Sequence, residues 1–587
     1  MIRRSLQWVR PWVGTVRPAI AFLAGVAVLV LGTIGFHRLK SADYGLLDSL
    51  YRSLGLFGLG GDVAPPVPVT LEIARFLGPL VTGYAALRGL VLLFRERVQH
   101  VRVRLFARDH VVVAGLGEMG RRLAAAFREG GHHVVAIDGN VHSAGAEGAR
   151  ERGAIVVAGD AADPALLART GVDRARLLFL TCGEDGINVD AAAAAEQLLD
   201  QRKTGILTVF AHLDDPELLR SLTAEALTTA REPSIRLEFF NVYLTAARLM
   251  VQRWPPFKDT PDPHVLIVGL ESVGEQLLLH LVNTWHALTV DQAPRLRVTV
   301  AGPNAESDVA ALIERQPALE RACRLDARQM PLESGAFREG GAMAGEDGAA
   351  DVTFAYVCLW SQSQAMAAAL ALHARPDTCA VPVVVALPDA NAGVGVALAD
   401  DEGRMSRIEP FGVFSEAATP AVLLGGTTEQ IARAKHEQYR RAELARGITP
   451  DENPSVAPWD ELPESLRDSN RRFADGIGDK LAETGCGLAP TPLVLDGEGP
   501  MFEFSDEEVE ALARAEHDRW MADLERDGWR PTTGPKDPEQ RLHPLLVPWE
   551  ELPEAERDKD REPVREIPEM LARAGLRVYR SRGRART

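Results

Sequence analysis

The sequence predicts an α/β protein: two parallel-sheet domains in tandem, preceded by a two-helix transmembrane segment and followed by mainly α-helical repeats. Three observations predict this organisation. Short apolar runs, such as residues 111–114 and 265–268, alternate with helical stretches, as they do in parallel sheets. A run without charge covers residues 18–36. A segment that combines Trp, Arg and acidic residues occurs twice after residue 430.

Length and composition limit the number of domains and the kinds of partner and site that we expect. The chain has 587 residues, enough for about three to five domains. It carries 65 Lys and Arg against 82 Asp and Glu, a net charge of −17, so we expect no nucleic-acid partner. None of its five cysteines forms a CxxC pair, and the sequence therefore predicts neither a metal site nor a disulfide framework.

Residues 1–108 contain two candidate membrane spans, at 18–36 and 76–94. Each has about the length that crosses a bilayer, although Arg88 lies inside the second. The first run is too long for the core of a signal peptide, which is the alternative. Basic residues flank the outer ends of both runs: Arg3, Arg4, Arg10, Arg17, Arg95, Arg97, Arg102, Arg104 and Arg108. The positive-inside rule then predicts a multi-pass protein of the cell membrane with both termini in the cytoplasm.

Between these runs lies a helical segment, residues 44–55, followed by a glycine-rich stretch. This order resembles the re-entrant pore loop of two-span potassium channels, in which backbone carbonyls bind the ion. The resemblance implies a monovalent-cation filter at Gly58, Leu59, Gly60, Gly61 and Asp62. The TVGYG string of that family is absent, so potassium selectivity follows less directly than conduction. A plain glycine-rich turn is the alternative.

A dinucleotide-binding pattern begins at the strand 111–114. The strand runs into Gly115, Gly117 and Gly120, a helix follows, and a second strand ends at Asp138, 18 positions after the last glycine. Glycines at this spacing let backbone N–H groups approach a phosphate, and the acid accepts from ribose hydroxyls. The alternative is a Rossmann-like domain that has lost its ligand.

Further motifs around Asp160 and Thr181 resemble RCK domains of the TrkA-N type. The resemblance implies a regulatory domain over residues 109–255 that binds NAD(H) or an adenine nucleotide, ATP or ADP. The expected cofactor-binding residues are Gly115, Gly117, Gly120, Asp138, Asp160 and Thr181.

One position departs from that family. Several members have an arginine between the second and third glycines, and this chain has Glu118. Arg121 or Arg122 could contact the phosphate instead.

A second, degenerate copy is predicted over residues 260–428. Glu271 stands where the second glycine belongs, and the strand 297–301 ends without an acid. A charged side chain there would repel a phosphate, so we expect this copy to be structural or reassigned. For tandem RCK domains the resemblance implies a homotetramer with an eight-domain ring.

The C-terminal region is internally duplicated. Residues 432–439 recur as 513–520, and residues 458–464 recur as 548–554. The second copy, residues 505–587, resembles the ryanodine-receptor (RyR) repeat, and the first, residues 430–487, is partial. We expect Trp549 in the core and a linker over 488–504. A capping box is predicted at Ser505 and Glu508. The candidate residues for a second ligand are Trp520, Trp529, Arg541 and His543.

These features favour a ligand-gated, potassium-channel-like cation channel with a nucleotide-binding ring and a second sensor in the RyR repeat. Two alternatives remain open at this level. One is a non-conducting, membrane-anchored nucleotide sensor or defence effector. The other is a nicotinamide-dependent oxidoreductase, but His212 at a strand end has no partner motif for catalysis, so we expect no enzyme activity.

Overall fold

The computed structural model divides the chain into two compact units, 1–102 and 103–587, which are described separately. The described residues are 10–39, 45–58, 60, 63, 66–93, 103, 108–198, 205–228, 234–258, 260–288, 294–345, 350–374, 378–389, 407–491, 502–537 and 539–580.

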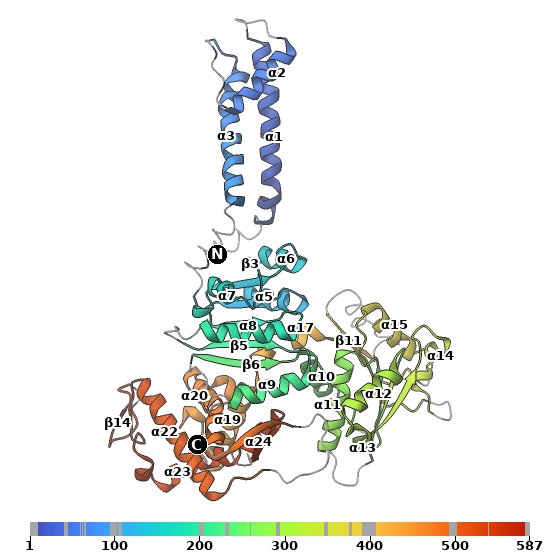
Figure 1. Cartoon of the computed structure of the whole chain (residues 1–587), viewed down its shortest axis with the longest axis vertical. Coiled ribbons are helices and arrows are strands. Elements are labelled where there is room, and N and C mark those ends of the chain that lie inside the picture. The colour runs from blue at the N-terminus through green and yellow to red at the C-terminus, as the bar shows by residue number, and fades with distance from the viewer. Residues whose placement is uncertain are drawn as a thin grey trace. The chain divides into compact units, whose positions relative to one another are not determined.

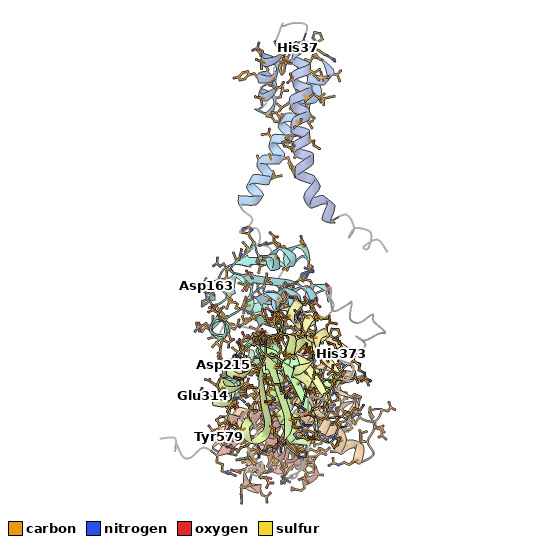
Figure 2. The ribbon with its side chains drawn as sticks, turned by 90° about the vertical axis from the view of Figure 1, so that its right-hand side faces the viewer. His37, Asp163, Asp215, Glu314, His373 and Tyr579 are labelled. Atoms are coloured by element: carbon orange, nitrogen blue, oxygen red, sulfur yellow. The ribbon has the colours of Figure 1, made fainter. Side chains whose placement is uncertain are left out.

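The first unit is built from helices. Its elements are α1 (Arg10–His37), α2 (Leu46–Gly55), the 3-10 turn η1 (Leu56–Gly58) and α3 (Val69–Leu93). Helices α1 and α3 pack side by side with α2 at one end (Figure 1), and the two long helices cross (Figure 2). Glycine permits this closeness, because a Cβ at Gly35 would lie 2.7 Å from Leu71 Cβ.

Helix α2 has its polar side inward. Ser49 and Ser53 are buried, and Ser53 Oγ lies 3.2 Å from Thr33 Oγ1 of α1. The opposite face is apolar and open, with Leu47 80 % and Tyr51 78 % exposed. Many apolar side chains of α1 and α3 are also exposed, among them Phe22, Leu23, Val30, Ile73, Phe76, Leu80 and Leu87. Among the described residues, no helix combines the length and apolar character needed to cross a membrane.

The second unit begins with a six-stranded parallel sheet in the order β3-β2-β1-β4-β5-β6. Its strands are β1 (Val111–Ala114), β2 (Val134–Asp138), β3 (Ile155–Ala158), β4 (Leu177–Leu180), β5 (Leu207–His212) and β6 (Ile235–Phe240). The helices are α5 (Glu118–Glu129), α6 (Ala144–Glu151), α7 (Pro164–Thr170), α8 (Asp185–Leu198), α9 (Pro216–Thr228) and α10 (Val242–Arg253), with η2 (Val172–Arg174). Every residue of β1 is buried, as expected for a strand covered on both faces.

A second sheet repeats this topology in the order β12-β11-β10-β7-β8-β9. Its strands are β7 (His264–Val268), β8 (Leu296–Gly302), β9 (Cys323–Gln329), β10 (Phe354–Val357), β11 (Val383–Leu387) and β12 (Ile408–Gly412). The helical elements are α11 (Ser272–Leu288), α12 (Ala305–Arg315), α13 (Leu319–Ala322), α14 (Gly335–Arg338), η4 (Gly341–Met343), α15 (Gln362–Leu372), α17 (Val413–Ala417) and α18 (Pro420–Leu423). The two sheets confirm the predicted tandem of parallel α/β, Rossmann-like domains.

The C-terminal copies share most of their elements, with η5 in the first where the second has β14 and β15. The first has α19 (Thr427–Ala445), η5 (Pro454–Val456), η6 (Trp459–Glu461), α20 (Glu464–Asp475), α21 (Ile477–Glu483) and β13 (Cys486–Pro490). The second has α22 (Asp506–Arg526), β14 (Arg530–Pro531), β15 (Leu542–His543), η7 (Trp549–Glu551), α23 (Glu554–Arg565), α24 (Ile567–Arg573) and β16 (Leu576–Arg580). The predicted capping box at Ser505 and Glu508 is present.

The two copies share one core. Strands β13 and β16 pair antiparallel, and Gly487 leaves room for the ring of Tyr579, which is labelled in Figure 2. The linker prediction for 488–504 is therefore wrong at its start, where residues 488–490 belong to a strand. Apolar side chains of both copies, including the predicted core residue Trp549, form one cluster.

The same hydrogen bonds recur inside each copy. Trp459 Nε1 donates to Glu429 Oε1 at 3.1 Å, and Trp549 Nε1 donates to Glu510 Oε1 at 2.9 Å. An arginine completes each network, because Arg471 pairs with Glu429 and Arg561 pairs with Glu510. Corresponding side chains therefore have the same partners, which supports the duplication inferred from the sequence.

The edge strand β6 anchors the first C-terminal copy. The buried Glu238 carboxylate accepts from the backbone N–H groups of Thr427 (2.9 Å) and Thr428 (3.0 Å), at the start of α19. Arg236 on the same strand makes two hydrogen bonds to Asp475. Helix α21 lies against the end of α9, where a Cβ at Gly478 would come within 1.9 Å of Leu227 O.

We predict that Gly478→Ala destabilises the protein by about 1–3 kcal/mol, because the added methyl group cannot fit against the Leu227 carbonyl. Urea unfolding of the full chain measures the effect. Gly186→Ala is the matched control, since Gly186 is also the second residue of a helix and a Cβ there meets nothing within 4 Å. Equal unfolding midpoints for both variants would contradict the tight docking of α21.

Candidate functional site

The loop after β1 is shaped by glycines. Gly115 has φ +82°, and a Cβ there would lie 2.6 Å from Thr181 O. A Cβ at Gly120 would lie 1.8 Å from Gly115 O, so α5 can approach the loop only without a side chain. A Cβ at Gly117 would meet no described atom within 4 Å. Gly115 and Gly120 therefore hold the turn, and Gly117 leaves the space in front of α5 open to a ligand.

Asp138 ends β2 beside this loop. Its Oδ2 accepts from Leu116 N at 2.8 Å, and its Oδ1 accepts from Asn140 N at 2.8 Å. The side chain is partly exposed. Both oxygens retain lone pairs for further donors, so this carboxylate can hold the loop and accept from a ligand hydroxyl at the same time.

The remaining predicted residues lie at the same edge of the sheet. Thr181 Oγ1 lies 2.9 Å from both Ala114 O and Gly115 O, which gives the buried hydroxyl a role in positioning the loop. Asp160 Oδ1 accepts from Ala162 N at 2.9 Å. Burial raises the pKa of Cys182 to about 11, and the negative charges of Asp138 and Asp160 add to that rise. The carboxylates of Asp138 and Asp160 therefore both lie near Cys182.

Sequence reasoning missed Asn188. Its amide is fully buried and joins the ends of β4 and β5, since Nδ2 donates to Cys182 O (3.0 Å) and His212 O (2.9 Å). Asn188 is the one asparagine of the alanine-rich helix α8, and this feature of the sequence could have pointed to it. Burial lowers the pKa of His212 to about 4, so the ring is neutral at pH 7.

The two arginines of the first helical turns pair with carboxylates. Glu118 Oε2 accepts from Arg121 Nε at 3.0 Å, and Glu118 Oε1 accepts from Arg122 Nε at 2.8 Å. Arg122 also donates to Asp389 at 2.6 Å. That Arg121 or Arg122 substitutes for the family arginine stays a prediction.

In the second sheet the position that corresponds to Gly117 carries a side chain, that of Glu271. Glu271 Oε2 accepts from Trp360 N at 2.6 Å, at the end of β10. The cavity left beside it measures about 20 Å³, which is too small for a nucleotide. This geometry supports the interpretation of the second copy as structural.

The predicted ion filter is described only in part. Gly58 ends η1, and Gly60 N donates to Gly55 O at 2.9 Å. Leu59, Gly61 and Asp62 lie outside the described residues.

A cavity of about 310 Å³ lies between the two C-terminal copies. Equivalent positions of the two copies line it in pairs: Lys435 with Glu516, His436 with His517, Tyr439 with Trp520, Ser455 with Leu545, Leu462 with Leu552, Leu466 with Glu556, Ser469 with Lys559, and Asn470 with Asp560. The segment around β14 and β15, which only the second copy has, adds Lys536 and His543. The cavity thus exists only when both copies are present.

The four residues proposed for a second ligand are not equally placed. Trp520 and His543 line the cavity, with their rings 5.0 Å apart. Trp529 and Arg541 are not among the described residues that line it. Trp529 packs edge-on against His543, and Arg541 Nη1 donates to Asp527 O at 2.7 Å. Burial and, to a smaller extent, the Lys536 charge lower the pKa of His543 to about 4, so this ring brings no positive charge at pH 7.

Charged groups form one wall of the cavity. Glu516 is fully buried, which opposes its ionisation, but three cations hold its pKa well below the usual value. The closest are Arg519 at 2.7 Å and Lys480 at 2.9 Å. Burial also opposes protonation of His517, yet Asp560 at 3.5 Å and the Val547 carbonyl raise its pKa overall.

Two family models match the chain. The TrkA-N domain matches residues 111–230, and the RyR domain matches residues 501–580. These matches confirm a TrkA-N type domain around the glycine loop and an RyR domain at the C-terminal end. No curated protein matches the sequence.

Several solved structures are similar in part. The structure of GsuK bound to ADP has 15 % identity and a TM-score of 0.37, and the match covers 69 % of this chain and 96 % of that one. The GsuK channel bound to NAD has 13 % identity and a TM-score of 0.38, covering 84 % and 88 %. The GsuK RCK domain has 12 % identity and a TM-score of 0.36, covering 56 % and 79 %.

Proposed function

We propose that the chain is a ligand-gated, potassium-channel-like membrane protein regulated by a nucleotide at its TrkA-N domain. One observation carries this proposal. The open Gly117, the N-terminus of α5 and the Asp138 carboxylate meet at the carboxyl edge of a parallel sheet, near the neighbouring strands β1 and β4 where the strand order reverses. Dinucleotides and mononucleotides bind at such a point, with a phosphate at the helix N-terminus and the ribose on the acid.

The proposed ligand is NAD(H), ATP or ADP. Its binding would favour one conformation of a ring of domains in a homotetramer and so shift the population between closed and open forms. The proposed role is regulatory rather than enzymatic, and turnover of a nicotinamide cofactor by the purified protein would contradict it.

The channel part of the proposal rests on the first unit. Its helices expose many large apolar side chains, and α2 turns its leucines and Tyr51 outward. Apolar surface of this kind is normally covered by a partner or by lipid. Packing of four copies in a cell membrane, with both chain termini in the cytoplasm, would cover it and would bring four copies of the Gly58–Asp62 loop to one axis.

We also propose a second ligand in the cavity between the C-terminal copies. Tyr439 and Trp520 occupy equivalent positions and both line it. Aromatic rings on two sides suit a planar ring such as a nucleobase, and the neighbouring Asn470 and Asp560 can bond the edge of that ring.

For the nucleotide site, Asp138→Ala should weaken NAD⁺ or adenine-nucleotide binding tenfold or more, since leaving donors unpaired costs about 1–3 kcal/mol. Isothermal titration calorimetry on the full chain measures this. Asp138→Asn keeps one acceptor for Leu116 and should lose less affinity. Glu271→Ala, in the second copy, should leave the affinity unchanged. Wild-type affinity in Asp138→Ala would rule out this site.

For the second site, Trp520→Ala should reduce affinity by about 1–3 kcal/mol through loss of base stacking. Thermal shifts with ATP, ADP and cyclic AMP are measured in an Asp138→Ala background, which reduces the response of the nucleotide site. Trp529→Ala is the matched control, because Trp529 lies outside the cavity lining. If the Trp529 variant loses the response and the Trp520 variant keeps it, the ligand binds elsewhere.

For the channel, the wild-type protein in lipid bilayers should pass a monovalent-cation current that depends on nucleotide. Gly60→Val should abolish the current without preventing assembly of a tetramer, because a Cβ at Gly60 would lie only 3.0 Å from Gly55 O. Native mass spectrometry checks the assembly. A wild-type protein that binds nucleotide but stays silent would favour the non-conducting sensor instead.

A further inference from the structure

A charged hollow lies directly beside the proposed nucleotide site. It has a volume of about 620 Å³ and is lined by α5 on one side and by residues of the second α/β domain on the other. Glu118 is the first residue of α5 and follows Gly117, the glycine with open space around it. Its carboxylate therefore lies at the helix end where a ligand phosphate would bind.

The charges around Glu118 are balanced within the protein. Arg121 and Arg122 both donate to the Glu118 carboxylate, and Arg122 reaches across to Asp389 of the second domain. Burial raises the pKa of Glu118, but the two arginines lower it more, so the group is ionised at neutral pH. Two carboxylates thus neutralise two guanidinium groups, and neither of those cations is left over for a ligand.

We propose that Glu118 makes this site select dinucleotides, in which both ends of the pyrophosphate are esterified, over nucleotides that end in a free phosphate. The inference rests on the proposed nucleotide site. Each phosphate of that pyrophosphate carries one negative charge, whereas a terminal phosphate carries close to two at pH 7. Arg121 and Arg122 attract the larger charge of a terminal phosphate less while they are paired with the Glu118 carboxylate. NAD(H) then fits the site better than ADP or ATP.

The second α/β domain takes part in this selection. Asp389 holds the Arg122 guanidinium between two carboxylates, with Arg122 Nη2 and Asp389 Oδ2 2.6 Å apart. A terminal phosphate would compete with Asp389 for Arg122. The pyrophosphate of a dinucleotide, with one charge on each phosphate, competes less strongly.

The test compares NAD⁺, ADP and ATP by calorimetry on the full chain, without Mg²⁺, which would mask the phosphate charge. The wild type should bind NAD⁺ at least tenfold more tightly than ATP. Glu118→Gln should raise ATP affinity tenfold or more while changing NAD⁺ affinity less than threefold. Glu129→Gln is the matched control, since Glu129 lies on the same helix and lines the same hollow but sits at its far end.

Each outcome separates this inference from the proposed function. A wild type that binds none of the three nucleotides would refute the nucleotide site itself. A wild type that prefers ATP would refute the selection by Glu118 but keep the site. The same holds if Glu118→Gln changes NAD⁺ and ATP affinity equally, because the carboxylate would then not discriminate between the two phosphate types.

Discussion

The close approach of the backbone at the end of β1 is the constraint on which the proposed nucleotide site depends. Gly115 turns the chain with a positive φ directly against Thr181 O, and Gly120 lets α5 begin against that turn. Any side chain at either position would push α5 away from the sheet. The helix N-terminus, the open Gly117 and Asp138 come together only because these two positions carry no side chain.

The two α/β domains show how one scaffold can keep or lose a pocket. Both have the same strand order, and Gly269 and Gly274 repeat the tight turn seen in the first domain. In the second domain the Glu271 carboxylate accepts the Trp360 N–H, and little space remains. In the second domain the Glu271 carboxylate thus accepts from a backbone N–H at the sheet edge. The same edge of the first domain remains open.

Duplication at the C-terminal end has a different consequence. The two copies keep the same internal contacts of Trp459 and Trp549, but they pack through a shared core and pair β13 with β16. Equivalent positions of the two copies then line one cavity. Divergence at these positions, such as Lys435 against Glu516, gives that cavity charged and aromatic walls that neither copy has alone. The Glu238 contact to α19 ties the first copy to the edge of the nucleotide-fold sheet.

The sequence by itself determined the features that depend on neighbours along the chain: the parallel α/β domains, the glycine loop with Asp138, and the capping box at Ser505 and Glu508. Their physical basis is local, in glycine φ angles, apolar strands and helix capping. The tertiary structure alone decided that Arg122 pairs with Asp389, 267 positions away. It also decided that Trp520, and not Trp529, faces the cavity between the copies. Such contacts join segments that are distant in sequence, and local patterns do not specify which distant side chains meet once the elements pack.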